Sequence, residues 1–153
     1  MKEIKKLIIC RGIQASGKST FAKKWVLEDK EHRIRINMDD IRLMLGGSKD
    51  AYWVPKRENL VKEIKEDSLR KAMMFKYDII IDNMNLNPKE TSYYETTVKL
   101  YNSRSFDTEY VIEYRDFFGV SLEECIERDK KRDNPIGEAA IRGTYNKYKD
   151  LFK

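Results

Sequence analysis

The chain has 153 residues, 37% charged and 41% hydrophobic, which suits one domain and is too polar for a membrane-spanning protein. A chain of this length buries roughly 70% of its unfolded surface on folding, so its core does not need a metal ion or disulfides. Basic residues exceed acidic ones by 31 to 26, and the net charge of +5 favours a polyanionic partner without naming one.

We expect residues 1–153 to form a single domain, because no linker or internal repeat interrupts them. The two cysteines, Cys10 and Cys125, lie in apolar stretches and are too few for a disulfide-dependent secreted domain. This pattern favours core cysteines in a cytoplasmic protein. The apolar run Leu7–Ile9 is far shorter than the hydrophobic region of a signal peptide, so we expect a strand there.

The first predicted strand, Leu7 to Cys10, leads into Gly12–Ser19, which reads Gly-Ile-Gln-Ala-Ser-Gly-Lys-Ser and precedes a helical pattern. This G-x-x-x-x-G-K-S motif between a strand and a helix is typical of a phosphate-binding loop. Backbone N–H groups would surround nucleotide phosphates, Lys18 would add a positive charge, and the Ser19 hydroxyl would bind Mg²⁺. The predicted nucleotide-binding residues here are Gly12, Ala15, Ser16, Gly17, Lys18, Ser19 and Thr20.

The second predicted strand, Arg33 to Asn37, is followed by the adjacent carboxylates Asp39 and Asp40. A carboxylate after a parallel strand lies where such sheets bind ligands, and it can orient an acceptor hydroxyl and take its proton. We predict Asp39 as the general base of a kinase and Asp40 as the cap of a short helix from Ile41 to Leu45. The alternative is that both aspartates only cap this helix.

A pair of aromatic residues, Tyr52 and Trp53, comes next and is flanked by Lys49, Lys56 and Arg57. Two interpretations fit about equally well. Either the aromatics stack on a terminal base while the cations meet phosphates, or the loop anchors its aromatics in the core. The apolar stripe of the long helix predicted after this loop comprises Val61, Ile64, Leu69 and Ala72.

The third predicted strand, Asp78 to Ile81, is an apolar run that ends at Asp82 and has the general form of a Walker B strand. Asp82 would orient a magnesium-bound water or accept from a substrate hydroxyl. Asn83, Asn85 and Asn87 follow it and suit a loop that faces a ligand. We therefore include Asn85 among the expected substrate-binding residues.

The remaining predicted elements are a helix capped by Asn87, a strand from Tyr110 to Tyr114, a helix with the capping box Ser121 and Glu124, and a last helix from Glu138. Strands that alternate with helices in this way indicate a parallel sheet. We expect about four strands, with helices on both faces of the sheet.

Two arginines, Arg128 and Arg132, are four residues apart and project from one face of the predicted fifth helix. They lead into Lys130–Gly137, whose composition suits a mobile flap. Two cations on a closing segment would bind the β- and γ-phosphates, and Arg132 would also stabilise charge in the transition state. The alternative is a solvated helix face with ordinary ion pairs.

Together these segments resemble the 5′-hydroxyl polynucleotide kinase domain of the T-even phage end-healing enzymes, over nearly the whole chain. Besides the phosphate-binding loop, the resemblance rests on Ile36–Arg42, Ile81–Pro88 and the pair Arg128 and Arg132. The Asn-Leu-Asn-Pro run at 85–88 is the most distinctive match, because many unrelated NTPases share the loop.

The resemblance implies a role for each matching residue. Asp39 would be the general base, Arg42 would bind the phosphate next to the terminal nucleoside, and Asp82 would be needed for activity. Arg128 and Arg132 would contact ATP phosphates.

The chain departs from this family at Met38, where the phage enzyme has a basic residue, and at Ala15, where it has glycine. These departures concern the grip on the substrate and the geometry of the loop. No Asp-x-Asp-Gly-Thr phosphatase signature follows before Lys153. Any 3′-phosphatase or ligase activity would therefore have to come from a separate polypeptide.

We therefore expect an α/β P-loop NTPase of the nucleoside-monophosphate-kinase type, with a small parallel sheet, flanking helices and a helical flap. The expected reaction is phosphorylation of the 5′-hydroxyl of DNA or RNA by ATP, with Mg²⁺ held by Ser19 and Asp82 and with no membrane partner. GTP is an alternative donor, because no residue pattern selects the purine. The main alternative is a kinase of a small-molecule hydroxyl (nucleoside, sugar or antibiotic), and a second is an ATP-responsive binding module without phosphotransfer.

Overall fold

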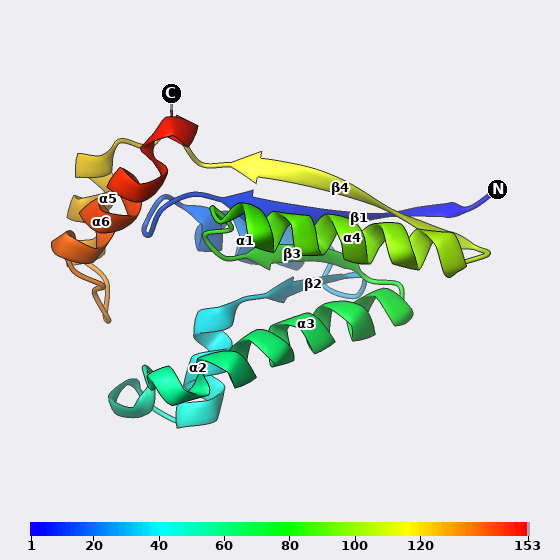
Figure 1. Ribbon diagram of the computed structural model, residues 1–153, viewed down its shortest axis with the longest axis horizontal. Helices are drawn as coiled ribbons and strands as arrows, with labels where there is room; N and C mark the ends of the chain where they lie inside the picture. The colour runs from blue at the N-terminus through cyan, green and yellow to red at the C-terminus, as the bar shows by residue number, and fades with distance from the viewer. Residues whose placement is uncertain (153) are drawn as a thin grey trace.

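The four predicted strands form one parallel sheet in the computed structural model, which describes residues 1–152. The strands are β1 (Glu3–Arg11), β2 (Arg33–Ile36), β3 (Asp78–Asp82) and β4 (Thr108–Asp116). Their order across the sheet is β2-β3-β1-β4. All four point the same way, so their carboxyl ends lie at one edge, at the left of Figure 1. The prediction of a small parallel sheet is confirmed.

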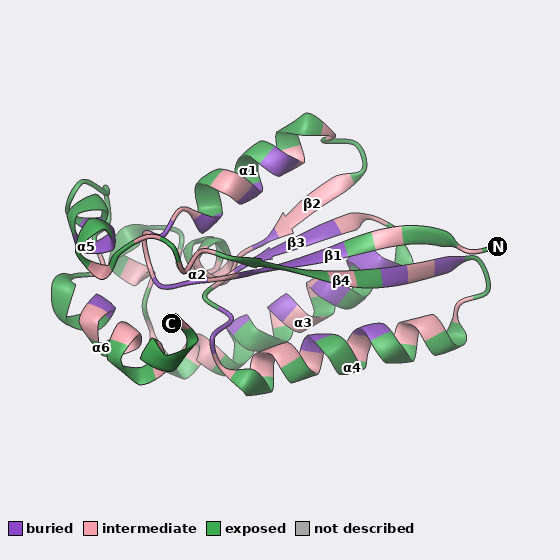
Figure 2. Ribbon diagram, turned by 90° about the horizontal axis from the view of Figure 1, so that it is seen from above, coloured by how far each residue is buried: buried purple, intermediate pink, exposed green. Residues whose placement is uncertain are grey.

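Six α-helices surround the sheet within the described residues. They are α1 (Lys18–Glu28), α2 (Met38–Gly46), α3 (Glu58–Met74), α4 (Pro88–Arg104), α5 (Leu122–Lys130) and α6 (Glu138–Tyr148). Figure 2 shows α1 on one face of the sheet and α3 and α4 on the other, as predicted. Helices α5 and α6 pack together beyond the carboxyl edge. No helix in the described part of the chain is long and apolar enough to span a membrane.

Strand β1 lies between two apolar layers, and alternate side chains enter each layer. Leu7 and Ile9 are fully buried in the cluster under α3 and α4, and Ile8 and Cys10 belong to the cluster under α1. A strand buried on both faces needs an unbroken apolar run, which explains why Leu7–Cys10 carries no polar residue. Both cysteines are buried, as predicted.

A third apolar cluster lies at the carboxyl edge and attaches α5 and α6 to the phosphate-binding loop. Its buried members are Ile13, Leu86, Cys125, Ile126 and Ile141. Because Ile13 belongs to the loop itself, this cluster holds the last two helices beside that loop. The third cluster is therefore the part of the core that positions the candidate site.

Two of the predicted helix caps are confirmed and one is wrong. Asn87 accepts a hydrogen bond from the backbone of Lys89, and Ser121 accepts one from the backbone of Glu124. Helix α2, however, begins at Met38 rather than at Ile41, and its cap is Asn37, whose Oδ1 accepts from the Asp40 N–H at 2.9 Å. Asp40 therefore sits inside the first turn, which frees its side chain for another partner.

Candidate active site

The phosphate-binding loop connects β1 to α1 in a conformation that requires small residues. A Cβ atom on Gly12 would lie 2.7 Å from Ser16 Oγ, and Gly17 has a φ of 103°, in the left-handed region that favours glycine. Ala15 also has a left-handed φ, of 61°. Ala15, where the phage enzyme has glycine, thus adopts a left-handed conformation that glycine would adopt with less strain.

Lys18 is 8% exposed, and its ammonium is held over the loop by protein oxygens. Its Nζ donates to the Ile13 carbonyl at 2.6 Å and to Ser16 Oγ at 3.4 Å. Burial lowers the pKa of Lys18 to about 8, against the opposing effect of the Asp82 charge. The next two residues, Ser19 and Thr20, are exposed on the first turn of α1, where their hydroxyls are accessible to a ligand.

Asp82 ends β3 beside Cys10 of β1, so its carboxylate lies where the phosphate-binding loop begins. The residue is 1% exposed, and its Oδ2 accepts from Arg35 Nε at 2.7 Å. Its Oδ1 is buried without a hydrogen-bond partner. An unpartnered carboxylate oxygen suits Mg²⁺, which binds oxygen ligands and usually completes its coordination with substrate phosphates and water. The described residues hold no cluster of three or more side chains that would bind a metal unaided.

Arg35 was not among the predicted site residues, although it connects two of the predicted carboxylates. Besides Asp82 it pairs with Asp40 through NH1, and its side chain is only 15% exposed. Its position on β2, opposite Ile80 of β3, brings it to the end of the Walker B strand. Arg35 could have been found only by knowing that β2 pairs with β3, and the linear sequence does not reveal which strands pair.

Asp39 and Arg42 lie together on the first turns of α2. Asp39 has a side chain that is 46% exposed, and its Oδ1 accepts from Arg42 NH1 at 2.6 Å and from the Tyr52 hydroxyl. Burial, followed by the Asp39 contact, raises the pKa of Tyr52 to about 12, so the phenol stays a donor at neutral pH. The opposite side of the Arg42 guanidinium pairs with Glu58, at 3.0 and 2.7 Å. Glu58 is a partner that sequence reasoning missed.

These contacts leave donors and acceptors free at this pair. A guanidinium has five N–H groups, and the hydrogen bonds to Asp39 and Glu58 use three of them. The Tyr52 hydroxyl also interacts with the guanidinium, so a phosphate would share the remaining N–H groups of Arg42 with that hydroxyl. Both bonds to Asp39 fall on Oδ1, so the half-exposed carboxylate keeps Oδ2 for a proton.

The two flap arginines approach the phosphate-binding loop from α5 and its C-terminal end. Arg128 NH1 lies 3.8 Å from the place where a Cβ of Gly17 would be, and Arg128 Nε also pairs with Glu124 at 3.1 Å. The charge of Arg132 lowers the pKa of Lys18, although less than burial does. The structure thus brings Arg128 beside the loop, and the charge of Arg132 reaches Lys18. Both arginines also make ion pairs within their own segment, as in the alternative interpretation, Arg128 with Glu124 and Arg132 with Asp129 at 3.5 Å.

The segment predicted as a mobile flap is tied back to α5 by one buried carboxylate. Asp129 is 2% exposed, and its oxygens accept from the backbone N–H groups of Ile136 and Gly137 at 3.0 and 2.9 Å. Lys49, in the loop after α2, donates from Nζ to the Asp133 carbonyl at 3.0 Å. The flap and the α2–α3 loop therefore touch at the carboxyl edge of the sheet. Asp129 was missed because it reads as one charge in a charged run.

Asn85 does not face a ligand, contrary to the prediction. It is 1% exposed, its Nδ2 donates to the Cys10 carbonyl at 2.7 Å, and its Oδ1 accepts from the Tyr94 hydroxyl at 3.1 Å. The side chain satisfies the backbone where β1 ends, so we remove Asn85 from the substrate-binding set. Asn83 has a related role, because its Oδ1 accepts from the Met38 N–H and ties the end of β3 to α2.

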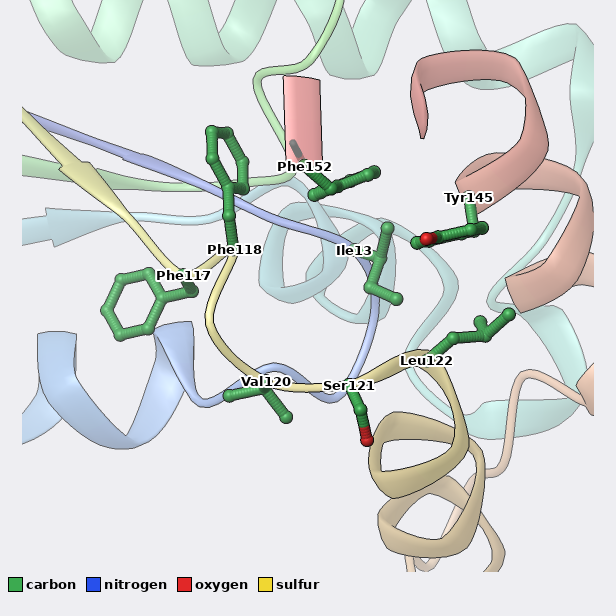
Figure 3. A pocket seen from close by; sticks show the side chains of 8 residues that line it. All are labelled: Ile13, Phe117, Phe118, Val120, Ser121, Leu122, Tyr145 and Phe152. Atoms are coloured by element: carbon green, nitrogen blue, oxygen red, sulfur yellow. The ribbon is translucent and has the colours of Figure 1, made fainter. Parts of the chain in front are cut away.

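A cavity of about 250 Å³ lies beside the phosphate-binding loop, between Ile13 and the C-terminal helices. Figure 3 shows Phe118, Tyr145 and Phe152 around it, and the rings of Tyr145 and Phe152 stack 5.1 Å apart. The hydroxyl of Ser121, also on its wall, already caps α5. The cavity thus lies beside the third cluster with both apolar and polar atoms on its wall, and we assign no ligand to it.

Comparisons with known proteins agree with this geometry. A family model described as an AAA domain matches residues 7–153. A protein of Autographa californica nuclear polyhedrosis virus named as a bifunctional polynucleotide kinase/RNA ligase is 25% identical over an alignment of 159 residues, which covers 94% of this chain and 21% of that protein. An L-seryl-tRNA(Sec) kinase of Methanococcus maripaludis is 26% identical over an alignment of 146 residues, which covers 93% of this chain and 52% of that protein.

Solved structures give the same result. A chain of the Pnkp1/Rnl/Hen1 RNA repair complex matches all of this chain and 48% of its own length, with 26% identity and a TM-score of 0.75. Another structure of a Pnkp1/Rnl/Hen1 complex matches 84% of this chain and 40% of its own, with 26% identity and a TM-score of 0.66. This chain thus spans about half or less of the length of these relatives, and the resemblance to polynucleotide kinase domains is confirmed. The chain belongs to the AAA domain family and has its P-loop kinase fold.

Proposed function

We propose that this chain transfers the γ-phosphoryl group of ATP to the 5′-hydroxyl of a polynucleotide. The observation that carries the proposal is the pairing of a half-exposed carboxylate, Asp39, with Arg42, which keeps N–H groups for a phosphate, at the sheet edge that holds Lys18. An acceptor that presents a hydroxyl and a phosphate close together matches this pair. The names of the viral relative and of the RNA repair complex support the same substrate class.

In the proposed mechanism the loop amides and Lys18 bind the β- and γ-phosphates, and Arg128 and Arg132 add positive charge from the flap. Mg²⁺, held by Ser19 and Asp82, would neutralise charge on the phosphates. Oδ2 of Asp39 takes the proton of the 5′-hydroxyl as its oxygen bonds to the γ-phosphorus. The bond from that phosphorus to the β–γ bridging oxygen breaks, and ADP leaves.

A second candidate is phosphorylation of an aminoacyl hydroxyl on RNA, which the seryl-tRNA kinase relative favours. A panel of acceptors separates the two: a 5′-OH oligonucleotide, a seryl-tRNA, a 3′-nucleotide and an unphosphorylated nucleoside, each incubated with labelled ATP and Mg²⁺. We expect transfer to the oligonucleotide and the 3′-nucleotide. Transfer to seryl-tRNA alone would replace the first proposal, and GTP in place of ATP tests the donor. A separate ligase or phosphatase partner and a cytoplasmic location stay predictions.

The matched variants are Asp39→Asn and Asp67→Asn, the second an exposed carboxylate on α3. We expect Asp39→Asn to lower kcat roughly 10²- to 10⁴-fold, the usual worth of general-base assistance, with ATP binding by calorimetry close to wild type. Asp67→Asn should leave both unchanged. Turnover of Asp39→Asn within a few-fold of wild type would exclude Asp39 as the base, and Asp40→Asn would then be the variant to test.

A further inference from the structure

Trp53 is unusually exposed for a tryptophan. The residue keeps 58% of its surface in solvent, whereas Trp25, the other tryptophan of the chain, is 9% exposed in the core under α1. Leaving a large indole in water forgoes the free energy that burial would provide. The interpretation that this loop anchors its aromatics in the core is therefore wrong for Trp53.

The position of Trp53 is set by contacts on both sides of it. The preceding Tyr52 donates its hydroxyl to Asp39. The Ala51 carbonyl accepts from Arg57 NH1 at 2.8 Å and presses against α2 so closely that a Cβ on Gly46 would lie 2.2 Å from it. The loop after α2 is thus held against the helix that carries Asp39.

The indole also lies next to the cation that the proposed mechanism assigns to the acceptor. The guanidinium carbon of Arg42 is 5.4 Å from the centre of the Trp53 ring. One turn of α2 and one loop therefore present a carboxylate, a cation with free N–H groups and an exposed aromatic ring side by side. A nucleotide at a 5′ end presents a hydroxyl, a phosphate and a flat base within the same short span.

We propose that Trp53 is the platform on which the terminal base of the acceptor stacks, an inference that rests on the proposed function. Stacking on an indole tolerates any base, because every base has a π-face. The platform would thus bind nucleic acid ends of many sequences and would discriminate against acceptors that lack a base. Trp53 would act on substrate binding, whereas Asp39 acts on the hydroxyl.

The first test is kinetic and compares Trp53→Ala with Trp53→Phe. On a 5′-OH oligonucleotide, Trp53→Ala should raise KM roughly 5- to 100-fold with little change in kcat, because stacking is equal in the ground and transition states. Trp53→Phe should retain most of the affinity. On the same oligonucleotide with an abasic 5′ residue, wild type and Trp53→Ala should have the same KM, because there is no base to stack.

The second test is the fluorescence of the protein without ATP. Adding the 5′-OH oligonucleotide should quench the emission of Trp53, and the abasic oligonucleotide should quench it far less. The quench should vanish in Trp53→Phe, in which the buried Trp25 is the only indole left. Phe106→Ala is the matched control, because Phe106 is 97% exposed between α4 and β4 at the opposite end of the sheet (Figure 1).

The outcomes separate this inference from the proposed function. If wild type phosphorylates oligonucleotides but Trp53→Ala keeps the wild-type KM, or loses equally on the abasic acceptor, the platform is refuted and the kinase assignment stands. If wild type phosphorylates no oligonucleotide, the proposed function fails. If the fluorescence quench also does not depend on the terminal base, the platform is refuted as well. Thermal melting of each variant verifies that it folds. Because Trp53 is exposed, its substitution should leave Tm close to the wild-type value.

Discussion

Replacing Arg35 by alanine should destabilise the protein more than any single surface substitution. Arg35 is the cation that pairs with Asp82, whose carboxylate is 1% exposed. Loss of one partner of a buried ion pair leaves an uncompensated buried charge and typically costs about 3–5 kcal/mol. Lys18, whose charge also interacts with Asp82, should offset part of this, so we expect a value near the lower end of that range.

The magnitude is large for a domain of this size. Domains of about 150 residues change their Tm by roughly 2–4 °C per kcal/mol, so a loss near 3 kcal/mol lowers Tm by about 6–12 °C. Asp40 also loses a partner, but its side chain is 58% exposed and adds at most about 1 kcal/mol. The loss is then a considerable share of the roughly 5–15 kcal/mol that stabilises an ordinary domain.

Urea unfolding, followed by circular dichroism, measures the effect as a lower midpoint at an unchanged slope. Arg70→Ala is the control, because Arg70 pairs with Asp67 at the surface and should cost under about 1 kcal/mol. The double variant Arg35→Leu/Asp82→Leu should recover much of the loss, since it removes both buried charges. A cost for Arg35→Ala no larger than that of Arg70→Ala would refute the reasoning, as would a double variant less stable than Arg35→Ala.

Three further outcomes follow from the site. Folding lowers the pKa of Lys18 from 10.5 to about 8, so between pH 8 and 10.5 the unfolded chain binds more protons than the folded one. The unfolding free energy of wild type, measured by urea titration relative to Lys18→Met, should therefore rise with pH across that window. Gly46→Ala should raise KM for the acceptor and leave ATP affinity near wild type, because its Cβ would displace Ala51; equal losses for both substrates would contradict this. Arg128→Ala should lower kcat more than it raises KM for ATP, and Arg128→Lys should rescue poorly because an ammonium cannot bridge two phosphate oxygens; near-normal steady-state kinetics would remove Arg128 from the mechanism.

The sequence predicted well those features that depend on a few neighbouring residues. The strand–loop–helix around Lys18 and the caps at Asn87 and Ser121 depend on local backbone hydrogen bonds and on unbroken apolar runs. The cap of α2 was misassigned because Asn37 and Asp40 are both good capping residues, and only the observed backbone shows which of them precedes the first turn.

The features that sequence could not supply depend on pairs far apart in the chain. The ion pairs of Arg35 with Asp82 and of Arg42 with Glu58 join different elements, and no periodicity encodes them. Asn85 looked like a ligand-facing residue because its neighbours are polar, yet it is buried to satisfy the carbonyl of Cys10. Burial of a polar side chain is decided by which unpaired backbone group lies opposite, and that requires the assembled sheet.

The central place of β1 has a consequence for synthesis on the ribosome. Leu7 of β1 pairs with Ile79 of β3 on one side and with Ile112 of β4 on the other. The first strand to be synthesised therefore pairs with two strands that are synthesised much later. At a translation rate of about 5–20 residues per second, β4 is synthesised roughly 5–20 s after β1. Throughout this time its apolar run has an open edge that other nascent chains could join, and the charges of Lys5 and Lys6 beside it oppose such pairing. Slower translation between β3 and β4 would lower the yield of folded protein without changing the stability of the molecules that do fold.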